Sequence, residues 1–184
     1  MIRVVAAGLL LVFVATPANA AHWVVDAAKS KLGFTVAWSN QPFAAVFHSW
    51  KADIEFDPAD LSRSHVLVTV DLASEASDSP DNDDGLKGVY GFAVSNFPTA
   101  RFETTKFEHL ADGSYAADAK LTIRGVMRMI RLPFKLSFGG NKVHMTGTTT
   151  LDRTAFGVGQ GEWAAPTPVA HTVTVTVDLT ATKS

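Results

Sequence analysis

The segment HTVTVTVDLT, residues 171–180, decides the fold class. Its valines and leucine fall on one face of an extended chain, while its threonines and aspartate fall on the other. A period of two is the signature of a β-strand with one buried face. The segment therefore predicts a strand whose apolar side belongs to the protein interior.

The same alternation recurs along the chain and predicts about eight strands, a number at which antiparallel strands commonly close into a barrel. Turn sequences such as Asp57-Pro58 and Gly139-Gly140-Asn141 separate the strands, and the short connections favour antiparallel neighbours. Pro133 falls inside one strand and predicts a sheet edge or a bulge there. The other seven expected strands are 32–38, 54–56, 66–72, 101–107, 118–124, 130–138 and 142–151.

One segment, residues 74–98, interrupts the alternation between the third and fourth expected strands. Its acidic run, residues 78–84, is typical of a loop that leads into a helix N-terminus. Apolar residues then recur at helical spacing from Leu86 to Ala93, and Pro98 ends the pattern. We therefore expect an all-β barrel with one short helix over an end.

The first twenty residues resemble a cleavable export signal. A short apolar run follows Arg3, and Ala18-Asn19-Ala20 has the form of a cleavage site. We expect residues 21–184 to form one mature domain that is soluble and periplasmic, or otherwise exported. The chain contains no cysteine, so packing rather than disulfides must hold this domain together.

Composition and motifs argue against several functional classes. A net charge of −2 gives no electrostatic reason to expect a nucleic acid partner. The acidic run fails the calcium-loop pattern, and no motif for a metal site or a catalytic nucleophile occurs. The glycine-rich segment 157–161 lacks the following helix that a phosphate site needs. We therefore predict no catalytic residues, no metal and no cofactor.

The apolar face remains, and two interpretations of it stay open. Its aromatic residues either fill a plain core or line a lumen that holds a hydrophobic ligand. Pattern alone slightly favours the plain core.

Five motifs, in this order, resemble the YceI-like family of polyisoprenoid-binding proteins over nearly the whole mature chain. They are WVVD (23–26) with SKLGF (30–34), FHSWKADIEF (47–56), NFPTARF (96–102), LTIRGV (121–126) and DRTAFGVG (152–159). The resemblance implies a lipocalin-like antiparallel barrel with a helix, and a polyisoprenoid or quinone-type lipid in its lumen. The chain departs from the family at Asp83-Asp84-Gly85-Leu86, where the family usually carries an arginine and a histidine. If these residues shape the entrance, this protein could select a different ligand from its relatives.

The resemblance leads us to expect a lumen lined by apolar residues from most strands. Arg124 and Arg153 are expected at the mouth, facing a polar head group. The alternatives are an enzyme for a hydrophobic substrate or an accessory subunit of a membrane redox protein, and a homodimer is compatible with each. The expected lumen residues are Phe34, Val36, Trp38, Phe47, Phe56, Val68, Val70, Phe92, Phe97, Phe102, Leu121, Ile123, Phe134, Met145, Phe156, Val173, Val175 and Val177.

Overall fold

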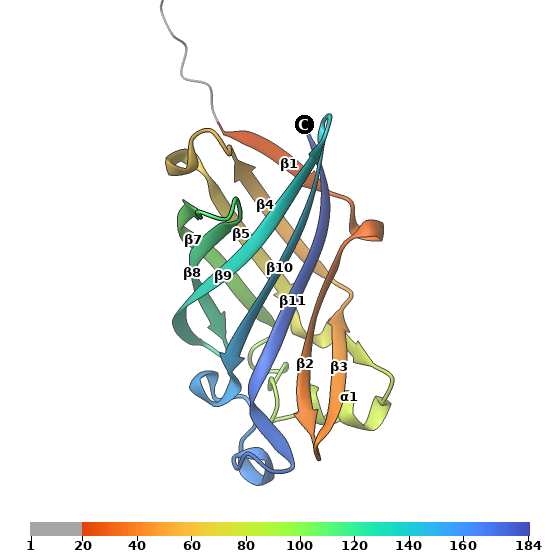
Figure 1. The fold of residues 1–184 in the computed structure, drawn as a ribbon. Helices are drawn as coiled ribbons and strands as arrows, with labels where there is room; N and C mark the ends of the chain where they lie inside the picture. Colours follow the sequence, from red (N-terminus) through yellow and green to blue (C-terminus); the bar gives the residue numbers. More distant parts are fainter. Residues whose placement is uncertain (1–19) are drawn as a thin grey trace, which may run out of the picture.

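The computed structural model describes residues 20–184, which form an 11-stranded antiparallel sheet that closes on itself (Figure 1). The expected export signal lies outside the described residues, except for Ala20. No helix among the described residues is long and apolar enough to cross a bilayer. The strands are β1 (Ala21–Val25), β2 (Lys31–Trp38), β3 (Gln41–Phe47), β4 (Trp50–Phe56), β5 (His65–Asp71), β6 (Glu75–Ser77), β7 (Thr99–His109), β8 (Tyr115–Ile123), β9 (Val126–Gly139), β10 (Lys142–Asp152) and β11 (Val169–Lys183).

Three of the barrel's wall strands are each broken into two pieces. β1 and β2 form the first of these wall strands, and both pair with β11. β4 and β3 form the second, in which β4 pairs with β1 and β3 pairs with β2. β5 and β6 continue the pattern beside β4 and β3. Together with β7 to β11 these give eight wall strands, and the pairing of β1 with β11 closes the barrel. The predicted eight-stranded antiparallel barrel is therefore confirmed.

The interruptions come at short polar turns that reorient the chain. Between β1 and β2, the Ser30 hydroxyl donates to the Asp26 carbonyl and accepts from the Thr180 amide. After β5, the Asp71 carboxylate caps the 3-10 turn η3 (Leu72–Ser74). These side chains bond backbone groups that the interrupted ladders leave unpaired, as caps and turns do elsewhere.

The helix lies where the sheet splits at one end of the barrel. β6 pairs with β3 but not with β7, and α1 (Pro80–Lys87) follows directly after β6. The prediction of a helix from Leu86 onward was wrong, because the acidic run itself forms the helix. Pro80 at its first position and two aspartates in its first turn favour this start. Beyond Gly88 the chain makes successive turns up to Pro98.

Two groups of buried side chains occupy the two ends of the barrel. One gathers around Phe34, Leu72, Phe92 and Phe156 beneath α1. The other gathers around Trp23 and Phe56, whose ring centroid lies 5.3 Å from that of Phe107. The candidate site lies along the axis between them.

Candidate binding cavity

A cavity of about 290 Å³ lies inside the barrel and reaches both groups of buried side chains. This volume lies just below the roughly 300–1,000 Å³ typical of small-molecule sites. Val173, Val175 and Val177 face it from β11, so the alternation of the opening segment sets the inner wall. Among the described residues, Arg153 is the one charged side chain in this wall. The arrangement suits an apolar chain rather than a polar molecule.

All four tryptophans of the chain line the cavity, namely Trp23, Trp38, Trp50 and Trp163. Trp38 and Trp163 lie in contact, with ring centroids 5.4 Å apart. Only Trp38 was among the expected lumen residues, so Trp23, Trp50 and Trp163 were missed. Alternation with Ile54 and Phe56 could have identified Trp50, whereas Trp163 comes from an irregular loop that carries no periodic signal. Leu86 was also missed and enters the wall from α1.

The structure places every expected lumen residue on the cavity wall except Phe97. The expectation for Phe97 was wrong. Its backbone lies in a turn closed by hydrogen bonds to the Ala93 carbonyl, and its half-buried ring lies under the Arg124 guanidinium, 5.9 Å from the ring centroid. Phe97 therefore supports the outside of the barrel end.

Arg153 does not face a head group at the mouth, so that expectation was also wrong. Its side chain is 7% exposed, and its N–H groups donate to six backbone carbonyls. The Nε atom lies 2.9 Å from the Ala170 oxygen, and Nη2 lies 2.7 Å from the Val169 oxygen. A guanidinium has five N–H donors, all of which are committed here. Arg153 therefore holds together the connection between β10 and β11.

The barrel end beneath α1 is closed by residues 80–98, which we call the cover. Leu86 and Phe92 point from it into the cavity, and the Phe92 ring packs against Phe34 and Phe47 at centroid distances of 6.4 and 6.1 Å. On the opposite side, the Tyr90 carbonyl accepts hydrogen bonds from the Gly159 and Gln160 amides. The cover is therefore fastened to the β10–β11 connection.

Arg124 fastens the cover from another direction. Arg124 and Gly125 form the two-residue turn between β8 and β9, with φ angles of 50° and 73°. Such a turn needs positive φ at both positions, which favours glycine. The Arg124 Nη1 atom donates to the Val89 oxygen at 2.9 Å and to the Gly91 oxygen. Its Nη1 atom therefore holds the cover, and the expectation that Arg124 faces a ligand head group stays a prediction.

Two carboxyl groups lie buried where the cover meets β6. Asp83 accepts hydrogen bonds from the Ser77 amide, at 3.0 Å, and from the Ser77 hydroxyl. Burial alone would raise the pKa of Asp83, but these hydrogen bonds lower it. Glu75 is 1% exposed, and its carboxyl group lies beside that of Asp83, to which it can donate a hydrogen bond when it is protonated. Burial, followed by the charge of Asp83, raises the pKa of Glu75 to about 7.

Replacing Arg124 by Ala is expected to loosen the cover without unfolding the barrel. Amides 88–96 should exchange with deuterium at least several-fold faster, because two carbonyls of the cover lose their donor. Hydrogen exchange read by mass spectrometry checks this, with exposed Arg128→Ala as the matched control. Unchanged exchange in the Arg124 variant would contradict the role given to this side chain.

The closed barrel and its apolar interior define a lipocalin-like β-barrel protein. Residues 23–181 match the YceI-like domain, so the chain belongs to the YceI-like family.

Several known proteins are similar to the chain. A UPF0312 protein of Vibrio vulnificus is 28% identical over 165 residues, covering 84% of this chain and 87% of the relative. The crystal structure of BcnA from Burkholderia cenocepacia is 30% identical, with a TM-score of 0.83 over 86% of this chain and 100% of that one. A polyisoprenoid-binding domain from Saccharophagus degradans, implicated in plant cell wall breakdown, shares the fold at 14% identity, with a TM-score of 0.69 over 90% and 100%.

Proposed function

We propose that this protein is an exported, periplasmic binding protein that holds an isoprenoid-type lipid chain in the barrel lumen. The observation that carries the proposal is the apolar cavity of about 290 Å³, whose one charged wall residue among those described has its donors committed to carbonyls. The name of the Saccharophagus domain supports the same class of ligand. The expected signal at residues 1–20 supports export.

Burial of apolar surface supplies the affinity in this proposal. Each Å² removed from water contributes roughly 25 cal/mol, so a long prenyl chain needs no polar recognition inside the lumen. Selectivity then comes from the length and width of the cavity. A quinone head group on such a chain is compatible with the site. Catalysis on a hydrophobic substrate is less well supported, because general acid–base chemistry needs titratable groups at the reacting atoms.

A bulkier residue in the middle of the lumen is expected to weaken prenyl binding at least tenfold. Val175 lies on β11 opposite Phe34 of β2 and Thr149 of β10, and its side chain lines the cavity. A phenylalanine there fills space that the ligand needs. Because all four tryptophans line the cavity, quenching of their fluorescence by a prenylated quinone measures binding directly.

The matched control is Thr176→Phe, the neighbouring exposed position on the same strand. It should bind as the unaltered protein does. A second lumen variant, Val177→Phe, and circular dichroism of every variant separate lost binding from lost folding. Binding of equal strength by the Val175, Val177 and Thr176 variants would show that the ligand does not occupy the lumen.

A further inference from the structure

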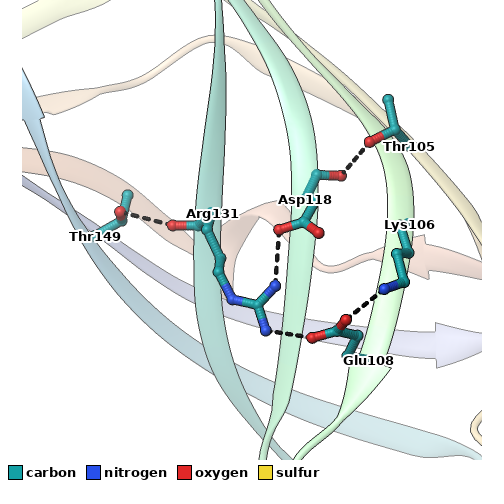
Figure 2. Close-up of polar contacts among 6 residues, drawn as sticks. All are labelled: Thr105, Lys106, Glu108, Asp118, Arg131 and Thr149. Carbon is teal, nitrogen blue, oxygen red and sulfur yellow. Dashed lines mark hydrogen bonds and ion pairs between the residues drawn. The ribbon is translucent and has the colours of Figure 1, made fainter.

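The first half of β9 leaves its neighbour β10 and forms a free sheet edge. The ladder between these strands runs from Gly139 opposite Lys142 to Phe134 opposite Gly147, and ends there. The next residue of β9 is Pro133. Because proline has no backbone N–H, it cannot donate to the ladder, which agrees with the sheet edge predicted at this position. Further on, the Thr149 hydroxyl donates to the Arg131 carbonyl at 2.9 Å (Figure 2). In Figure 1 the two strands diverge toward the end that carries the cover.

This edge exposes large apolar side chains. We call residues 126–131 the β9 edge. Met127 is 48% exposed and Met129 is 57% exposed, although the strand pairs with β8 through Thr122 and Lys120 on its other side. Lys120, the cross-strand neighbour of Met129, shares this outer face, whereas Arg128 is exposed but leaves the opposite face of the strand, because its cross-strand neighbour Leu121 lines the cavity. Neighbouring exposed apolar residues of this size mark interaction surfaces more often than chance.

Basic residues predominate in the sequence around the β9 edge, although Glu103, Glu108 and Asp118 lie on the neighbouring strands. The segment from Ala119 to Lys135 contains five basic residues and no acidic residue, although the whole chain carries a net charge of −2. Glu108 and Asp118 neutralise Arg131 across the outer face of β7, β8 and β9 (Figure 2). Lys120 and Arg128 have no ion-pair partner among residues 20–184. The cross-strand neighbour of Lys120, Glu103, pairs instead with Arg101 at 3.4 Å.

We propose that the β9 edge docks the barrel onto the surface of an anionic lipid bilayer. Flexible methionine side chains insert into the interface while neighbouring Lys and Arg contact acidic lipid head groups, as on other interfacial surfaces. Docking there brings the cover, which Arg124 links to the β8–β9 turn, close to the bilayer. The inference concerns the outer surface and goes beyond the proposed lumen function, so either can fail alone.

Co-sedimentation of the full mature chain with vesicles tests the proposal without any prenyl ligand. The protein should bind vesicles of phosphatidylcholine with phosphatidylglycerol, and bind phosphatidylcholine alone at least fivefold more weakly. Binding should fall as salt rises, because exposed charges are screened. Met127→Ser with Met129→Ser, and separately Lys120→Glu, should each weaken binding at least fivefold.

Two control variants carry the same changes elsewhere on the surface. Val24→Ser removes an apolar side chain that is 54% exposed on β1, and Lys142→Glu reverses an exposed charge at the start of β10. Both should bind vesicles normally, and all variants should keep the circular dichroism spectrum of the unaltered protein. Failure of the unaltered chain to bind anionic vesicles, or equal loss in the controls, would overturn the proposal. A concentration-dependent dimer that the Met127→Ser, Met129→Ser variant abolishes would also overturn the proposal, because the β9 edge would then be an interface between two copies of the chain.

Discussion

Replacing Arg153 by Met should lower the free energy of unfolding by about 3–5 kcal/mol, because it breaks a buried hydrogen-bond network. The guanidinium fills space beneath Gly159 and donates to six carbonyls between Val158 and Ala170. Methionine replaces much of the volume but none of the donors. The buried carbonyls then lose this donor, and two of them left without any partner, at about 1–3 kcal/mol each, already account for the loss.

Urea unfolding followed by circular dichroism measures this loss. Arg153→Lys should recover little stability, because an ammonium group cannot reproduce the planar set of donors. The matched control is Arg128→Met, which removes an exposed arginine whose hydrogen bond is to the Met127 carbonyl. That substitution should change the free energy of unfolding by less than about 0.5 kcal/mol, as surface substitutions usually do. An Arg153→Met protein as stable as the control would show that the carbonyls do not depend on this side chain.

Replacing Glu75 by Gln should stabilise the protein at pH 8 by about 1–3 kcal/mol, because at that pH the buried carboxyl group is ionised beside the charge of Asp83. Burial raises the pKa of Glu75 to about 7, so the folded protein holds this proton more tightly than the unfolded chain. Stability from this group is therefore complete below about pH 4.5 and is lost as the pH rises through 7. Glutamine stays neutral and removes that loss.

The melting temperatures of the two proteins should converge below about pH 4.5 and separate as the pH rises through 7. The matched control is Asp84→Asn, which removes an exposed carboxylate from the same helix, α1. That variant should follow the pH dependence of the unaltered protein. A Glu75→Gln protein with the same fall in stability between pH 5 and 8 would show that another group titrates in this range.

The alternation in the sequence predicted most of the wall because strand geometry is local. Successive side chains of a strand alternate between its two faces. Because the threonines of β11 are polar, the valines between them must face the interior. Pro133 was equally informative, since a residue without an N–H cannot continue the ladder with β10. In both cases the residue itself carries the constraint.

The cover and the polar contacts could not be predicted in this way. Helical spacing suggested a helix after Leu86, but Gly88 and Gly91 follow, and a Cβ at Gly91 would collide with the Leu86 carbonyl. Arg153 looked like a loop arginine, and its six carbonyl partners come together only in the folded chain. Glu75 gave no signal, because its burial depends on a helix that packs over it from later in the sequence.

Native mass spectrometry of the protein purified from its own host tests the central claim most directly, because it detects what the lumen holds. The account predicts a bound species whose mass fits an isoprenoid chain or its quinone, present in the unaltered protein and in Thr176→Phe but absent from Val175→Phe. Organic extraction should release the same lipid. A protein that is empty in the spectrometer, yields no lipid on extraction and takes up no prenyl ligand would contradict the account.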